Sequence, residues 1–182
     1  MGKIIAIVGM CGSGKSVAGT YLEEKGFKKV YFGGVTLEKL KEEGLEVTPE
    51  SEKYMREKLR NELGMGAFAK ILFPKIKELA KNNNVVLDGL YSWDELKIIE
   101  EEFRDQLTTI AIIVDKKIRY ERLSIRPVRP FNQEKAKDRD ITEIENIAKA
   151  GPIAYADYYI DNNKTIKELQ IRLEEILKEI EE

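Results

Sequence analysis

The chain has 182 residues, of which 31 are basic and 33 acidic, so its formal net charge is −2. This length suits one well-buried α/β domain spanning 1–182, with insertions in place of a second core. The near balance of charges argues against a general nucleic-acid surface. The single cysteine and the lack of histidine exclude an internal disulfide and histidine acid–base catalysis.

No apolar run reaches the roughly 18 residues that a membrane-spanning helix needs, and no charged segment followed by an apolar one marks the N-terminus for secretion. We therefore expect a cytoplasmic protein without membrane or nucleic-acid partners.

A glycine-rich segment near the N-terminus is the most informative part of the sequence. It has the phosphate-binding loop pattern of glycine, four residues, and then Gly-Lys-Ser. The residues are Gly9, Met10, Cys11, Gly12, Ser13, Gly14, Lys15 and Ser16. Residues 3–8 before it predict a buried strand, and residues 17–25 after it predict a helix that Gly26 ends. Strand, loop and helix are the context that the motif requires.

The residue types of this loop indicate what it binds. Glycines let successive amide groups point inward, and the helix N-terminus at Val17 adds the positive end of its dipole. Lys15 would reach the β- and γ-phosphates of ATP, and the Ser16 hydroxyl would coordinate Mg²⁺. The sequence therefore predicts ATP and Mg²⁺ as cofactors.

Two helices are expected after a short second strand at residues 26–32, which Gly33 and Gly34 end. This insertion, at about 33–66, resembles a flap that grips an acceptor. Arg56 and Arg60 are four residues apart and share a helix face, which suits binding of an acceptor phosphate. An ordinary solvated helix surface fits the same pattern.

A long helix over residues 67–82 precedes a buried strand, 85–88, that ends in Asp88. Ligands of doubly wound sheets bind beyond the carboxyl ends of the strands, so Asp88 is the second candidate magnesium ligand. An Asp before Gly is also a common turn residue. Ser92 and Glu95 form the pattern of a capping box and predict a helix start.

An arginine-rich segment follows the next buried strand, 107–115. Arg119, Arg122 and Arg126 are spaced three and four residues apart and are expected on one helix face. Prolines end this helix, and Arg129 lies between them. We expect a positive lid at about 126–140 that stabilises the migrating phosphoryl group. A surface cluster without a ligand is the alternative.

The remaining elements are a polar crossing at 133–139, a helix at 141–147, and a last strand and loop at 156–163. Residues 164–182 carry one apolar stripe, which favours a helix packed on the sheet over a coiled-coil dimer.

The whole chain resembles the phosphate-loop kinases of the nucleoside monophosphate kinase and dephospho-coenzyme A kinase group, in particular an adenylate-kinase-related branch labelled as AAA-type ATPases. The segments that carry the resemblance are Gly9–Ser16, Asp88–Trp93, Arg119–Arg129, Arg139–Glu145, Gly151–Ala154 and Ala156–Asn162. The resemblance implies a three-layer α/β/α sandwich whose five parallel strands have the order 2-3-1-4-5. It also implies that Arg122 or Arg126 lies against the adenine or its phosphates, and that the loop around Asn162 borders the base.

Two departures from these kinases concern the acceptor. Monophosphate kinases commonly have an Asp where this chain has Gly33-Gly34, and adenylate kinases have an arginine after Asp-Gly, where this chain has Leu90-Tyr91-Ser92. The acceptor pocket, with Tyr91 as a lining candidate, is therefore not a standard adenylate kinase pocket. An acceptor phosphate needs no base. The missing carboxylate therefore favours a phosphate as the acceptor, unless Asp88 or Asp94 is the base.

The sequence thus predicts an ATP- and Mg²⁺-dependent kinase that transfers the γ-phosphoryl group to a small molecule, with a nucleoside monophosphate as the leading acceptor. Dephospho-coenzyme A-like hydroxyl phosphorylation and a regulatory ATPase are the alternatives. The candidate catalytic residues are Lys15, Asp88, Arg122, Arg126 and Arg129. Either a monomer or a homodimer is expected.

Overall fold

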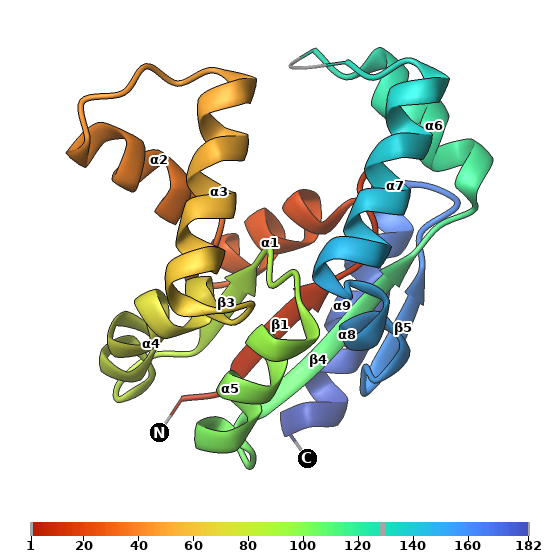
Figure 1. Ribbon diagram of the computed structural model, residues 1–182. Coiled ribbons are helices and arrows are strands. Elements are labelled where there is room, and N and C mark those ends of the chain that lie inside the picture. Colours follow the sequence, from red (N-terminus) through yellow and green to blue (C-terminus); the bar gives the residue numbers. More distant parts are fainter. Residues whose placement is uncertain (1, 128–129, 182) are drawn as a thin grey trace.

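A computed structural model describes residues 2–127 and 130–181 and shows a parallel sheet between layers of helices (Figure 1). Its five strands lie in the order β2-β3-β1-β4-β5. They are β1 (Ile4–Val8), β2 (Lys28–Tyr31), β3 (Val85–Asp88), β4 (Leu107–Ile113) and β5 (Tyr158–Asp161). The predicted three-layer α/β/α fold with strand order 2-3-1-4-5 is confirmed.

The register of the central strands determines where a ligand site can form. Ile7 of β1 pairs with Asp88 of β3, and Val8 pairs with Ala111 of β4, with all strands parallel. The carboxyl end of β1, where the phosphate loop begins, therefore lies beside the end of β3. Because β1 and β3 are buried along their whole length, the carboxyl ends of these two central strands are held in place by packing on both faces.

Alternate residues of β1 face two different layers of the core. Ile5 and Ile7 pack with α1 (Lys15–Glu24) and α9 (Ile166–Glu181) on one face. Ile4, Ala6 and Val8 pack on the other face with α4 (Ala67–Ala80) and α5 (Trp93–Phe103). The apolar stripe of α9 supplies Leu169, Leu173 and Ile176 to the first layer, which confirms that this helix packs on the sheet.

Two helical arms rise beyond the carboxyl edge of the sheet (Figure 1). The flap consists of α2 (Gly34–Glu42) and α3 (Pro49–Leu63). Helix α3 begins with a capping box between Thr48 and Ser51 and has Pro49 in its first turn. The lid contains α6 (Lys116–Ile125) and α7 (Gln133–Ile147), and the short α8 (Ala150–Ala154) returns the chain to β5.

The lid differs from its prediction in two respects. Residues 133–139, expected as a polar crossing, form the first half of α7, so the helical lid extends past 140 to Ile147. Asn132 caps this helix by accepting a hydrogen bond from the Lys135 amide, at 2.9 Å. The sequence lacks the apolar spacing that predicts a helix here, because the buried face of α7 consists of Ala136, Asp140 and Glu143.

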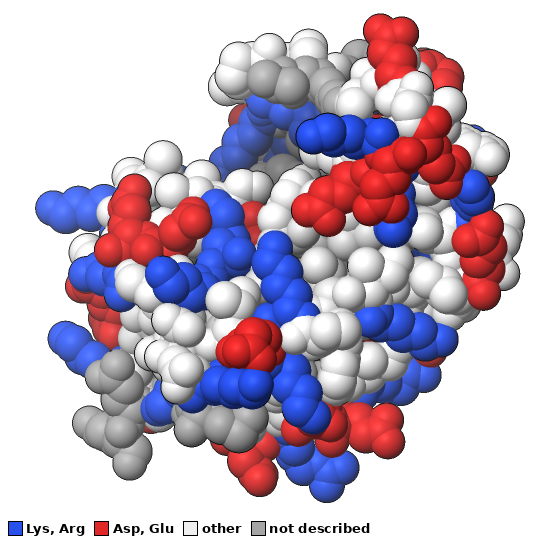
Figure 2. All heavy atoms as spheres, turned by 90° about the vertical axis from the view of Figure 1, so that its left-hand side faces the viewer, with Lys and Arg blue, Asp and Glu red and all other residues white. Residues whose placement is uncertain are grey.

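The surface has no large patch of one charge on the face in Figure 2, where acidic and basic side chains are interspersed. Among the described residues no helix is both long and apolar enough to cross a membrane.

Candidate nucleotide and acceptor site

The phosphate loop has backbone angles that its glycines make accessible. Gly12 and Gly14 have φ values of 81° and 101°. A Cβ atom on Gly12 would lie 2.9 Å from the Arg119 carbonyl oxygen, and one on Gly14 would lie 2.5 Å from Asn162 Nδ2. Helix α1 begins at Lys15, so its N-terminal amides face the loop. The geometry is that of an anion cradle.

Lys15 is folded across this loop. Its Nζ donates a hydrogen bond to the Met10 carbonyl at 2.9 Å. Burial, followed by the positive charge of Lys149, lowers the pKa of Lys15 to about 7. The Ser13 hydroxyl is buried and has no hydrogen-bond partner among the described residues. A ligand with several acceptor oxygens, such as a nucleotide phosphate, fits these donors.

Asp88 lies at the end of β3 and is buried, with its carboxylate against Gly19 of α1. Burial raises the pKa of Asp88, and the positive charges of Lys15 and Lys29 oppose that rise. Within residues 2–127 and 130–181, no three Cys, Asp or Glu side chains are placed to hold a metal ion. Ser16 and Asp88 thus stay the predicted ligands of a magnesium ion, whose other ligands would be phosphate oxygens and water.

Arg119 and Arg122 lie three residues apart on α6, but Arg126 follows the end of the helix and does not continue their face as predicted. Arg119 is turned into the protein and forms two hydrogen bonds with the Asp140 carboxylate, at 2.9 and 2.7 Å, and a third with the Cys11 carbonyl, at 3.0 Å. Arg126 lies beyond the helix, in extended backbone, with its guanidinium 4.3 Å from the Phe131 ring centroid. Arg129 lies outside the described residues. Arg119 thus connects the lid helix to the phosphate loop.

Arg122 and Asn162 come together beside the phosphate loop. Arg122 Nη2 donates to the Asn162 carbonyl at 2.8 Å, and Asn162 Nδ2 donates to the Ser13 carbonyl at 2.9 Å. Arg122 and Asn162, which are 40 positions apart in the sequence, therefore lie together on one side of the phosphate loop.

Across the site from the phosphate loop, the flap presents Arg56 and Arg60. Arg56 pairs with Glu52 at 3.4 Å, and the Arg60 guanidinium lies 5.1 Å from the Phe68 ring centroid. Burial lowers the pKa of both arginines, and the charge of Arg139 from the lid lowers both further. The positive charge of Arg139 therefore reaches the two flap arginines, although the residues come from two different arms.

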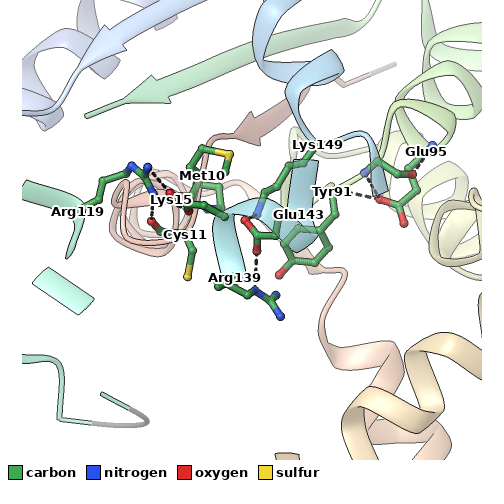
Figure 3. Close-up of polar contacts among 11 residues, drawn as sticks. Met10, Cys11, Lys15, Tyr91, Glu95, Arg119, Arg139, Glu143 and Lys149 are labelled. Atoms are coloured by element: carbon green, nitrogen blue, oxygen red, sulfur yellow. Dashed lines mark hydrogen bonds and ion pairs between the residues drawn. The ribbon is translucent and has the colours of Figure 1, made fainter. Parts of the chain in front are cut away.

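The structure also brings to this site a group of three charged residues that the sequence did not single out. Lys149 Nζ and Arg139 Nε both contact the Glu143 carboxylate, at 2.7 and 2.9 Å. The Lys149 ammonium lies 4.8 Å from the centroid of the Tyr91 ring. Figure 3 shows Glu143 between the two cations and Tyr91 beside Lys149. Burial raises the pKa of the Tyr91 phenol, so Tyr91 stays neutral.

No carboxylate base occupies the position where monophosphate kinases have one. A Cβ atom on Gly33 would lie 2.4 Å from the Tyr31 ring, which covers this position. Asp94 pairs with Lys97 at 2.7 Å, its side chain is 44% exposed, and it lines a separate hollow with Gly66 and Lys70. Asp88, the other candidate base, is buried at the end of β3, beside the strand that leads into the phosphate loop.

The chain has the fold of the P-loop kinases, with a phosphate loop after β1 and helical arms on both sides of it. Comparison with solved structures shows the same fold in known kinases. Shikimate kinase from Bacteroides thetaiotaomicron superposes with a TM-score of 0.60 at 18% identity and covers 97% of this chain and 98% of its own. Shikimate kinase from Acinetobacter baumannii in complex with shikimate has a TM-score of 0.65 at 16% identity, with 98% and 94% covered. At this identity the likeness shows the fold alone.

The chain belongs to the UPF0200 protein family, and its residues 5–146 match the family described as an AAA domain. The UPF0200 protein of Sulfurisphaera tokodaii is 38% identical over 184 residues, covering 98% of this chain and 97% of that protein. The UPF0200 protein of Thermococcus onnurineus is 34% identical over 181 residues, with 97% of both chains covered.

Proposed function

We propose that this protein is an ATP- and Mg²⁺-dependent phosphotransferase whose acceptor is a small molecule that already carries a phosphate, with a nucleoside monophosphate as the first candidate. The P-loop kinase fold supports nucleotide-dependent phosphoryl transfer. The choice of acceptor rests on the side of the site that faces the phosphate loop.

The observation that carries this choice is the group of three guanidinium groups of Arg56, Arg60 and Arg139. Burial lowers the pKa of Arg56 and Arg60, and the charge of Arg139 lowers both further. Arg60 Nε is buried and has no hydrogen-bond partner within the described residues. A phosphate dianion would neutralise the group and accept hydrogen bonds in fork geometry.

Each remaining residue has a role in this proposal. The amides of residues 9–16 and Lys15 bind the ATP phosphates, and Arg122 with Asn162 borders the nucleotide. Mg²⁺, held by Ser16 and Asp88, would neutralise developing charge on the phosphates. Arg126 and Arg129 are proposed to stabilise the transferring phosphoryl group. Tyr91, neutral and packed on Lys149, shapes the acceptor side.

The absence of a carboxylate at residue 33 supports a phosphate acceptor. A hydroxyl acceptor must lose a proton during transfer, whereas a phosphate oxygen is already ionised near neutral pH. Transfer to a phosphate therefore needs positioning and neutralisation of charge, which arginines supply.

The test is ADP release from Mg-ATP with a panel of acceptors: each nucleoside monophosphate, dephospho-coenzyme A and shikimate. We expect acceleration by at least one monophosphate. Lys15→Ala should abolish it, and Arg60→Gln should raise the acceptor KM at least tenfold through loss of a charged hydrogen bond. Arg172→Gln, on the exposed surface of α9, is the matched control. Equal rates with and without every acceptor would contradict the proposal.

A hydroxyl acceptor of the dephospho-coenzyme A type is the second candidate, and one observation favours it. Asp88 is buried beside Lys15 and has a raised pKa, which are properties of a general base. Acceleration by dephospho-coenzyme A alone would select this reaction. In the regulatory ATPase alternative, ATP binds but no small acceptor accelerates its hydrolysis.

A further inference from the structure

A second cavity lies beside the candidate site, between the lid and the edge of the sheet. Its volume is about 600 Å³, within the range of small-molecule sites. Its walls come from α6, α7, α8 and β5, and one phosphate-loop residue, Met10, reaches it. Lys15, Asp88, Arg122 and Asn162 are not part of its lining. The cavity thus adjoins the phosphate loop at Met10 but is not lined by these four predicted nucleotide-site residues.

The walls of this cavity are apolar and partly open to solvent. Lys137, Ile141 and Ile144 follow one stripe of α7, at spacings of four and three residues. Ile141 and Ile144 are 41% and 47% exposed, and Tyr159 of the edge strand β5 is 46% exposed. Three large apolar side chains therefore line one hollow, rather than being scattered over the surface.

Apart from one buried ion pair, the charged residues that line this cavity are basic. Arg119 and Asp140 neutralise each other in their two-hydrogen-bond pair. Lys116 and Lys137 also line the cavity, and both are exposed residues. An apolar wall with cations at its rim matches a ligand that has an apolar body and an acidic group.

We propose that the cavity between α6, α7, α8 and β5 is a binding site for a small amphipathic anion, with its apolar body against Ile141, Ile144 and Tyr159 and its acidic group near Lys116 and Lys137. The site is distinct from that of the nucleotide and its acceptor. It does not depend on the proposed phosphotransfer.

Anilinonaphthalene sulfonate (ANS), which joins an apolar aromatic body to a sulfonate, is a suitable probe, and N-phenylnaphthylamine is its uncharged counterpart. The experiment titrates the folded full-length protein with each fluorescent probe, with and without saturating Mg-ATP. The variants are Ile144→Asp, Ile141→Asn and Lys137→Glu. Ile171→Asp on α9 is the matched control, because Ile171 is also 47% exposed on a helix. Thermal melting shows that each variant is folded.

We expect one ANS site that Mg-ATP does not displace. Ile144→Asp should weaken ANS binding about tenfold, because an apolar contact is replaced by a repelling charge. Ile141→Asn should act in the same direction, and Ile171→Asp should have no effect. Lys137→Glu should weaken ANS binding several-fold and leave the uncharged probe unchanged.

The proposal is overturned if folded Ile144→Asp and Ile141→Asn bind ANS as the unchanged protein does. It is equally overturned if Mg-ATP competes with ANS for one site, or if the native protein binds no ANS. None of these results depends on whether the protein transfers phosphate, so each is separable from a failure of the proposed function.

Discussion

Glu95 at the start of α5 makes stability depend on pH in a way that can be calculated. Its Oε2 atom accepts hydrogen bonds from the amides of Tyr91 and Ser92, at 2.7 and 3.0 Å. Its Oε1 atom is buried without a partner among the described residues. Burial, although opposed by these amides, raises the pKa of Glu95 from 4.5 to about 7.

The sign of the effect follows from the two proton affinities. Below pH 4.5 the carboxyl group is protonated in the folded and unfolded chains alike, so it does not change stability. Between 4.5 and about 7 the unfolded chain releases the proton while the folded chain retains it, so folding weakens as the pH rises. At about 1.4 kcal/mol per pH unit, the loss reaches about 3 kcal/mol above pH 7.

The measurement is urea unfolding of the wild type and of Glu95→Gln from pH 5 to pH 8. The glutamine side chain can still accept the capping hydrogen bonds but cannot ionise. We expect the variant to gain about 2.5 kcal/mol relative to the wild type between pH 5 and pH 8, because part of the loss has already occurred at pH 5. Glu168→Gln is the control, because Glu168 caps α9 in the same way but is exposed and has a lowered pKa. A stability difference between wild type and Glu95→Gln that stays constant with pH would refute the reasoning.

Three further predictions concern the backbone and the buried charges, and each is measured by urea unfolding. Ala148→Gly should stabilise the protein by about 0.5–1 kcal/mol, because Ala148 has a left-handed φ of 50°; a loss of stability would contradict this. Gly12→Ala should cost more than Gly26→Ala, which has a similar positive φ but nothing within 4 Å of its added methyl group; equal costs would show that the Arg119 carbonyl gives way. Arg119→Met should cost about 3–5 kcal/mol by leaving Asp140 buried and unpaired, and Arg119→Met/Asp140→Leu should recover most of it; no recovery would mean that the contact to Cys11 dominates.

Local signals predicted the strand, loop and helix that form the phosphate loop. The conformation of the phosphate loop depends on its glycines and Lys15, which lie close together in the sequence, so their spacing is enough to predict it. The place of Asp88 followed from the parallel sheet, since strands that run in one direction end at one edge. The capping box of Ser92 and Glu95 is likewise local, and it is present in the structure.

The lid was harder to predict because its contacts are long-range. The spacing of arginines on α6 says which residues are neighbours, but not that Arg119 would turn to Asp140, which is 21 positions away. Arg139 and Glu143 are four residues apart on α7, a spacing that a helix prediction over 133–147 would have exposed. Lys149 had no such signal, because the left-handed residue Ala148 redirects the chain between them.

Arg56 and Arg60 lie on the flap, and Arg139 lies on the lid. Whether these two arms can approach each other therefore depends on the charge of what lies between them. Glu52 pairs with Arg56, and Glu143 is shared by Arg139 and Lys149, so two carboxylates face four cations and the group keeps a net positive charge. Without an anion, the flap and lid therefore have an electrostatic reason to stay apart. An occupant with two negative charges would reverse that balance. An uncharged occupant, including water, would not. The arms would then distinguish acceptors by charge before any chemical step begins.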